Sequence, residues 1–476
     1  MAYKDMREYL IVLEKKGLLR KIKKEVDKDW ELSAVSRITF TKIPSERRPA
    51  LMFEQIKDFN IPVVTGILGG SREIYATALG LPENYLLEEI AEKWASAIQN
   101  PVVPELVSTG ACKENILRGN KIDLLKFPVP IWTVGEDPDP YLTSPYVISK
   151  DPDTGIQNVG TYRVQIKDKK KTGLYIGKTR HMYRHILKNN EKNKPTEVAI
   201  VLGTDPTIGL TSVASIPYGI DELAVAGGLR NAPVEVVKCE TVNLVVPASA
   251  EIVIEGIIPA GASEMEGPFG EYTGYMGPAG LAPYIEVTCI THRNQPIYQA
   301  FVSQMPPSES SLIRSIGRES SIFTHLKYDH RMPIRDVRIK EASGAAAYLA
   351  ISMKSQFPGQ IWEAVWAAWT LDPSLGKFTI VVDDDIDIRD DFALDWALSF
   401  RVQPSKDIYI INDTSAVHLD PSVAPRDILQ SDPSRNISSK IFINATKKHK
   451  FPHIALPPKE HLEKVLKDWG QYGIEK

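Results

Sequence analysis

Two carboxylates flank a stiff turn in the stretch EMEGPFGEYTGY, residues 264–275. Glu266 and Glu271 stand on either side of Gly-Pro-Phe-Gly, and a proline at this place cannot belong to the interior of a regular helix. Acids are common on protein surfaces, so a solvated turn is one interpretation. The other is that the turn directs both acids into a pocket, where carboxyl groups exchange protons with a substrate.

Three further residues offer a mixed ligand set: Asn158, His181 and Glu222. Each has an ordinary explanation, as a turn residue, a surface histidine among basic neighbours and a carboxylate in the first turn of a helix. Together they provide an amide oxygen, an imidazole and a carboxylate, which suits Mn²⁺ or Mg²⁺ better than Zn²⁺. Arg163 lies five residues beyond Asn158. Its permanent charge suits an anchor for an acid substrate, a partner for the glutamates or a surface salt bridge.

A run of acids in VVDDDIDIRDD offers another candidate metal site. Asp383, Asp384, Asp385 and Asp387 follow an apolar strand, where a Mg²⁺-phosphate enzyme places its metal ligands. However, the chain has no phosphate loop, no dinucleotide fingerprint and no nucleophile elbow. We therefore favour strand-end acids that cap the next helix and pair with Arg389.

The overall composition excludes several classes of protein. The chain has 476 residues, enough for two or three domains, and a formal net charge of -3, which does not suggest a nucleic-acid or membrane partner. Its three cysteines lie far apart without C-x-x-C spacing, which disfavours a disulfide framework or a zinc cluster. We find no apolar signal segment and no uncharged apolar stretch of membrane-spanning length, so we expect a cytoplasmic protein.

The elements that must position these residues change in kind along the chain. Helical spacing and short apolar runs alternate up to about residue 100, whereas period-two strands joined by Gly/Pro turns dominate from about 120 to 305. Helix-like and strand-like segments alternate again after 310, and the tail has the pattern of an amphipathic helix. We predict an α/β multi-domain fold with a barrel-like middle, and domains at 1–115, 116–310 and 311–476.

Several motifs together resemble the UbiD family of prenylated-FMN-dependent decarboxylases. They are NVGTYR, RH, PYGIDELAVAGGLR, PVEVVKCET, PASAEIVIEG and EGPFGEYTGY. The resemblance runs in order from about residue 5 to 450. It implies an N-terminal α/β region, a central split β-barrel-like domain that binds the cofactor, and a C-terminal α/β oligomerisation domain with a terminal helix.

The resemblance also implies a role for each candidate residue. Arg163, Glu266 and Glu271 correspond to a catalytic Glu-Arg-Glu network in which Glu271 exchanges the proton. Asn158, His181 and Glu222 correspond to ligands of Mn²⁺ (or Mg²⁺), which bridges to the flavin phosphate. The predicted K⁺ site uses Ser212, Ala214 and Glu222. The remaining expected cofactor contacts are Thr161, Tyr162, Arg180, Val213 and Lys377, together with the metal ligands and Arg163.

The implied activity is reversible, non-oxidative decarboxylation of an aromatic, heteroaromatic or α,β-unsaturated acid. Prenylated FMN, supplied by a partner flavin prenyltransferase, would act as the electron sink. The resemblance further implies a homodimer or homohexamer. A non-catalytic cofactor-binding subunit of a larger carboxylase is the main alternative, and an ordinary FMN oxidoreductase is a second. Substrate and physiological direction stay open.

Overall fold

The N-terminal region is an α/β unit around a small sheet. The computed structural model describes residues 3–82, 84–417, 419–424 and 436–473. The small sheet has the order β1–β2–β3–β20, so a late strand completes an early sheet. Its elements are α1 (Met6–Lys15), β1 (Leu19–Ile22), α2 (Glu31–Lys42), β2 (Ala50–Phe53), β3 (Val63–Thr65), α3 (Arg72–Leu79), α4 (Leu87–Gln99) and β20 (Tyr298–Gln299).

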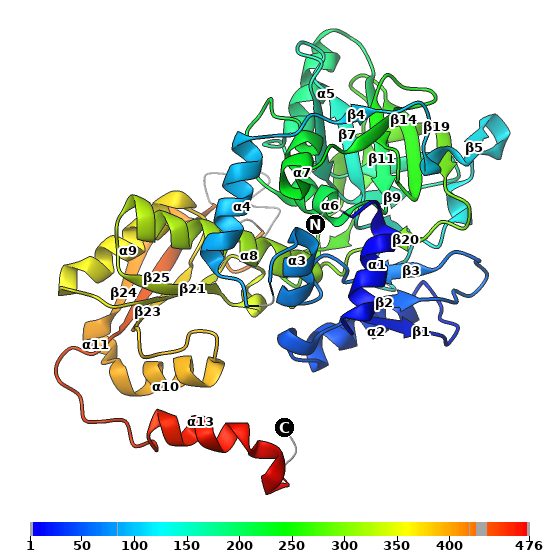
Figure 1. Cartoon of the computed structure of the whole chain (residues 1–476). Coiled ribbons are helices and arrows are strands. Elements are labelled where there is room, and N and C mark those ends of the chain that lie inside the picture. Colours follow the sequence, from blue (N-terminus) through cyan, green and yellow to red (C-terminus); the bar gives the residue numbers. More distant parts are fainter. Residues whose placement is uncertain (1–2, 83, 418, 425–435, 474–476) are drawn as a thin grey trace.

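A curled, mainly antiparallel sheet forms the centre of the chain (Figure 1). Its order is β6–β9–β10–β19–β14–β11–β7–β8, and β5 pairs with β19. The strands are β5 (Asn115–Arg118), β6 (Tyr141–Leu142), β7 (Tyr146–Lys150), β8 (Gln157–Thr161), β9 (Val164–Ile166), β10 (Lys171–Leu174), β11 (Thr196–Leu202), β14 (Ile252–Ile258) and β19 (Tyr284–His292). Helices α5 (His181–Glu191), α6 (Pro206–Val213) and α7 (Glu222–Arg230) connect strands of this sheet.

Alternation along the strands explains why this sheet is covered on both faces. In β11, Val198, Ile200 and Leu202 pack into one apolar cluster, whereas Ala199 and Val201 pack into the other. Successive side chains of a strand point to opposite faces of the sheet. A run of consecutive apolar residues therefore needs an apolar layer against each face. Helices α6 and α7 pack on one face of the sheet and α5 contributes to the core on the other.

Short paired strands accompany the central sheet. They are β4 (Glu105–Leu106), β12 (Glu235–Lys238), β13 (Val245–Pro247), β15 (Glu264–Glu266), β16 (Phe269–Gly270), β17 (Met276–Gly277) and β18 (Gly280–Ala282). β15 pairs with β18 and β16 with β17, so the stretch around the two glutamates is held as paired strands. The parallel pairing of β4 with β12 shows that residues 105–106 belong to a sheet, although the sequence around them reads as a linker.

The C-terminal domain is a separate α/β layer structure. Its sheet has the order β21–β22–β23–β25–β24, with α9 packed on one face and α10 on the other. The elements are α8 (Glu309–Thr324), β21 (Ile334–Ile339), β22 (Tyr348–Met353), α9 (Pro358–Leu371), β23 (Phe378–Asp383), α10 (Asp391–Arg401), α11 (Pro404–Asp407), β24 (Ile408–Ser415), β25 (Ile437–Ala445) and α13 (Lys459–Lys467).

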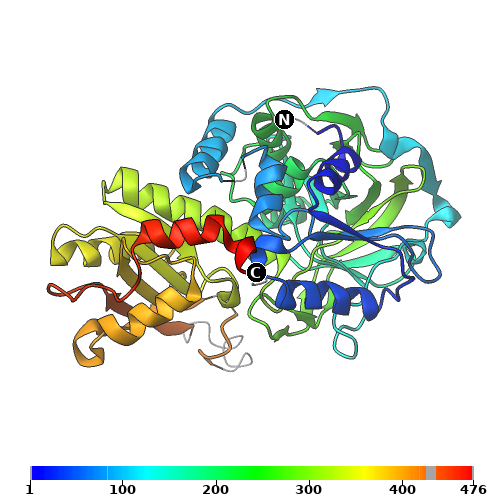
Figure 2. The same cartoon turned by 60° about the horizontal axis from the view of Figure 1, so that its bottom comes forward.

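Helices α4 and α8 lie between the two larger parts of the molecule. Helix α4 packs on α8 and on α7, and α8 also contacts β21 (Figure 1). Helix α13 follows an extended segment and has no buried residue; Figure 2 shows it from a second direction. None of the described helices is long and apolar enough to cross a membrane. The predicted fold class is confirmed, whereas the exact domain boundaries stay a prediction.

Candidate active site

Arg163 bridges the two glutamates of the 264–275 stretch. Its Nε and Nη2 donate to Glu266 Oε1 and Oε2 at 2.8 and 2.7 Å, and its Nη1 donates to Glu271 Oε1 at 2.6 Å. The arginine is 103 and 108 positions away from the two acids, so the fold has to bring them together. Both acids therefore point to the same guanidinium, and the turn is not a solvated surface loop.

The surroundings of Arg163 are mostly closed to solvent. Its side chain is 9% exposed, that of Glu266 2% and that of Glu271 17%. The guanidinium lies over the ring of Tyr175 at 4.1 Å and near Phe269 at 5.3 Å, as cations do over aromatic faces. Burial disfavours its charge, but the two carboxylates outweigh burial, so the pKa of Arg163 is raised. The group therefore stays a cation throughout any proton exchange nearby.

Two glycines allow the acids to approach the arginine. Gly267 has a φ of +84°, a conformation that side chains rarely adopt, and it turns the chain directly after Glu266. Gly173 in β10 faces Glu266, because a Cβ there would lie 3.2 Å from Glu266 Cγ. Phe269 packs against the buried Tyr141 ring at 4.4 Å, which anchors the turn between the acids.

A second cluster contains the three candidate ligands of a divalent cation. Asn158 lies in β8, His181 begins α5 and Glu222 begins α7, so three different elements contribute to it. Asn158 Oδ1 is 3.2 Å from His181 Nδ1, which is 4.0 Å from Glu222 Oε1. Glu222 Oε2 also accepts a hydrogen bond from the backbone N–H of Val159 at 2.8 Å. The sequence-predicted ligands are therefore neighbours in space.

The chemistry of this cluster fits a hard divalent cation. Burial raises the pKa of Glu222 to about 8, so its charged form needs a positive partner at neutral pH. Asn158 and Glu222 would offer oxygen atoms and His181 a ring nitrogen to such a cation. With the Asn158 amide turned over, its NH₂ would instead donate to Glu222 Oε1 at 3.2 Å. A bound cation favours the orientation in which Asn158 Oδ1 faces His181. Without a cation, the turned-over orientation is favoured, because its NH₂ group donates to Glu222.

The other predicted cofactor residues lie around this cluster, with one exception. Thr161 and Ser212 share a hydrogen bond of 2.8 Å, and Val213 and Ala214 mark the end of α6. Tyr162 lies over Gly160, where a Cβ would meet its hydroxyl group at 2.3 Å. Arg180 directly precedes α5 and the candidate ligand His181.

Lys377 is the exception. It precedes β23 in the C-terminal domain, and its described bonds go to Asp420 Oδ2 at 2.8 Å and Ser422 Oγ at 2.6 Å. These partners belong to the same domain, so the structure does not bring Lys377 into the ligand cluster.

The acid run after β23 forms structural ion pairs. Asp383 and Asp385 bind Arg401 at 2.9 and 2.8 Å. The expected ion pair with Arg389 is wrong, because the Arg389 side chain binds Asp336 on β21 at 2.8 Å, whereas its backbone N–H donates to Asp387 Oδ1 at 2.8 Å. Within the described ranges, no three His, Cys, Asp or Glu side chains are grouped to hold a metal. In the described structure the run therefore forms ion pairs, and the candidate divalent centre depends on the amide of Asn158.

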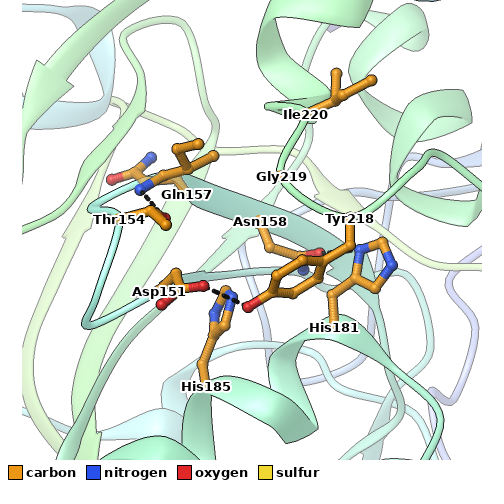
Figure 3. A pocket seen from close by; sticks show the side chains of 10 residues that line it. Asp151, Thr154, Gln157, Asn158, His181, His185, Tyr218, Gly219 and Ile220 are labelled. Atoms are coloured by element: carbon orange, nitrogen blue, oxygen red, sulfur yellow. Dashed lines mark hydrogen bonds between the residues drawn. The ribbon is translucent and has the colours of Figure 1, made fainter.

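Sequence reasoning missed a tyrosine beside the ligand cluster. Tyr218 lines one small pocket together with Asn158 and His181, with its ring against His181 and its hydroxyl group donating to Asp151 (Figure 3). Its position four residues before Glu222 is the only sequence signal that we can identify.

Models of known families match nearly the whole chain. They are described as the 3-octaprenyl-4-hydroxybenzoate carboxy-lyase N-terminal domain (residues 10–94), Rift-related domain (105–306) and C-terminal domain (311–445). An uncharacterised protein of Archaeoglobus fulgidus is 35% identical over 94% of this chain and 92% of its own length.

Solved structures agree in fold over the full length. The UbiD-class enzyme HmfF of Pelotomaculum thermopropionicum in complex with FMN has a TM-score of 0.85 at 36% identity, covering 98% of this chain and 100% of that one. An evolved dimeric form in complex with prFMN has a TM-score of 0.83, at the same identity and coverage. Vanillic acid decarboxylase of Sedimentibacter hydroxybenzoicus in an open form reaches 0.84 at 28% identity, covering 99% and 100%.

The family models and the solved structures of UbiD-class enzymes identify the chain as a multi-domain carboxy-lyase. The chain belongs to the UbiD family.

Proposed function

We propose that this chain is a reversible decarboxylase of an aromatic, heteroaromatic or α,β-unsaturated acid that uses prenylated FMN. The observation that carries the proposal is the bridge from Arg163 to Glu266 and Glu271. Support for the cofactor comes from the FMN and prFMN complexes of a relative at 36% identity. Support for acid substrates comes from the vanillic acid decarboxylase of similar fold.

The two candidate centres suit the two ends of one elongated cofactor. Asn158 and Arg163 belong to one extended segment, and five residues of extended chain span at most about 18 Å. A phosphate held near Asn158, His181 and Glu222 would therefore leave the ring system near Arg163. Asn158, His181 and Glu222 would hold Mn²⁺ (or Mg²⁺), which would supply positive charge beside the phosphate, and Ser212, Ala214 and Glu222 would hold K⁺.

The two glutamates differ in ways that suggest different roles. Bound prenylated FMN would supply the electron sink that removal of CO₂ from an sp² carbon requires. Arg163 attracts the substrate carboxylate. Glu266 holds Arg163 through both oxygens and is almost fully buried, so it orients the arginine. Glu271 is more exposed and meets Arg163 through Oε1, so we assign to it the transfer of a proton to the carbon that CO₂ leaves.

The direct test is activity of the isolated chain. The protein is co-expressed with a flavin prenyltransferase, and CO₂ release and ring deuterium exchange are measured on a panel of unsaturated and aromatic acids. Turnover by this chain alone supports the proposal. A chain that retains prenylated FMN but turns over no acid in the panel would instead match the non-catalytic subunit.

Replacement of His181 by alanine is expected to release the cofactor. It removes one of three metal ligands, and loss of an outer partner alone usually weakens metal binding about 10- to 100-fold. We therefore expect a Mn²⁺ affinity at least about 100-fold lower and a much smaller flavin-to-protein ratio. His325→Ala is the control, because His325 follows α8 in the C-terminal domain and its Nδ1 bonds to Asp329 Oδ2 at 2.8 Å, outside the ligand cluster. Equal flavin content in His181→Ala and the wild type would remove His181 from the site.

A homodimer or homohexamer is also part of this proposal. The C-terminal domain exposes large apolar side chains on α9 and β24, among them Trp366 (48% exposed) and Ile410 (66%). Exposed apolar residues on two neighbouring elements are typical of protein–protein contacts. The mass of the purified protein by light scattering tests this part independently of activity.

A further inference from the structure

The three elements that carry the candidate metal ligands are also joined outside the ligand cluster. Residues 214–220 connect α6 to α7, so they run from Ala214 at one candidate cation site to the residues before Glu222. Most of this loop is exposed, and Ile216 is its buried residue. Because so few of its side chains are buried, packing of this loop alone does not hold the start of α7 in place.

Tyr218 connects this loop to the hairpin that carries Asn158. Its hydroxyl group donates to Asp151 Oδ2. Asp151 follows β7 and accepts a backbone hydrogen bond from Asp153 at 2.9 Å, inside the turn that leads to β8. Lys188 Nζ lies 2.9 Å from both oxygens of Asp151, which ties the same carboxylate to α5. The loop, the hairpin and α5 therefore meet at one hydrogen-bonded carboxylate.

The ring of Tyr218 lies along one face of α5. It meets the His181 ring edge-on at 5.1 Å and the His185 ring at 6.0 Å. The Arg184 guanidinium is 5.0 Å and the Lys188 ammonium 5.7 Å from its centroid. These four residues have the spacing of one helix face. The tyrosine thus joins the loop before Glu222 both to the His181 ring and to Asp151 (Figure 3).

We propose that Tyr218, through its hydrogen bond to Asp151, is a positioning residue that holds the Asn158, His181 and Glu222 ligands at metal-binding distance. The inference rests on the divalent site of the proposed function. Each ligand comes from a different element, so binding a cation includes the cost of bringing the three elements into register. A contact that joins the same elements before binding removes part of that cost, as outer partners of metal ligands do elsewhere.

The contribution of Tyr218 to general stability is expected to be small. Its side chain is among the exposed large residues, at 36%, and it belongs to neither apolar cluster of the central sheet. Removal of its hydroxyl group leaves the ring and its contacts with α5 in place. Tyr218→Phe therefore changes the anchoring of the loop without opening the core.

The test is a Mn²⁺ titration of the flavin-free, full-length chain, followed by electron paramagnetic resonance. We expect Tyr218→Phe to bind Mn²⁺ about 10- to 100-fold more weakly and to give a broader bound-Mn²⁺ signal, at an unchanged thermal midpoint. Tyr183→Phe is the matched control, because it also removes one tyrosine hydroxyl group, in this case from α5. This variant should bind Mn²⁺ with the affinity of the wild type. Wild-type affinity in Tyr218→Phe would overturn the inference.

A double-mutant cycle tests whether the hydrogen bond is the means. Asp151→Asn should weaken Mn²⁺ binding as well. The double variant should have the same Mn²⁺ affinity as whichever single variant binds Mn²⁺ less tightly. Fully additive losses would contradict a shared contact. Failure of the proposed site has a different signature: in that case His181→Ala and the wild type bind Mn²⁺ equally, whatever Tyr218 does.

Discussion

Glu271→Gln is expected to reduce decarboxylation by about 100- to 10,000-fold, the usual contribution of a positioned general acid. Glutamine has nearly the same shape and still accepts a hydrogen bond from Arg163 Nη1 through its amide oxygen. It cannot donate a proton to carbon at neutral pH. The variant should therefore retain the absorbance of the bound flavin and lose both CO₂ release and deuterium exchange into the product.

The matched control for this prediction is Glu264→Gln. Glu264 lies two residues before Glu266 and forms an ion pair with Lys171 at 2.8 Å, with its side chain 34% exposed. Exposed pairs of this kind contribute little, so this change should leave turnover within about a factor of two. Wild-type turnover in Glu271→Gln would show that another group supplies the proton, whereas equal losses in both variants would indicate general damage to the turn.

The fold class could be predicted from the sequence because each domain has its own periodicity. The segment GQIWEAVWAAWTL has helical spacing and lies within α9 (Pro358–Leu371), and FTIVVD forms β23. Short strands are harder to recognise. Residues 105–106 pair with β12 although prolines interrupt the pattern around them, because two residues carry no period of their own.

The candidate site could be predicted only in part from residue patterns. The closeness of Glu266 and Glu271 follows from the turn between them, but their contact with Arg163 depends on a separation of more than 100 residues. Local patterns contain no such information, and the family resemblance supplied it. The position of Tyr218 escaped both approaches, because an exposed tyrosine in a loop looks like ordinary surface. The ion-pair partner of Arg389 could not be predicted either, because its side chain binds Asp336 on β21 and not the acids beside it in the sequence.

Arg163→Lys is expected to lower turnover by about 100-fold or more, although the charge is conserved. The guanidinium meets Glu266 with two parallel hydrogen bonds and meets Glu271 with a third, from nitrogen atoms in one plane. A lysine ammonium is a single point donor on a flexible chain and cannot hold both acids in this arrangement. Small errors in the placement of reacting groups cost about this much. The measurements are the turnover number and the flavin absorbance of the co-expressed variant.

Arg7→Lys is the control for Arg163→Lys. It distinguishes a specific effect on the active-site geometry from the general effect of weakening an arginine–glutamate ion pair. Arg7 binds Glu251 with Nε and Nη2, both at 2.8 Å, so the pair has the same bidentate form as Arg163 and Glu266, with Glu251 fully buried and Arg7 34% exposed. This ion pair joins α1 to Glu251, the residue directly before β14, and does not involve the turn that carries Glu266 and Glu271. Arg7→Lys should lower the thermal midpoint and leave the turnover number of the folded enzyme nearly unchanged, because the fully buried Glu251 would lose one of its hydrogen-bond donors. If Arg163→Lys keeps its turnover number and changes only its thermal midpoint, Arg163 would have the same purely structural role as Arg7, and the assignment of the carboxylate-binding step to it would be wrong.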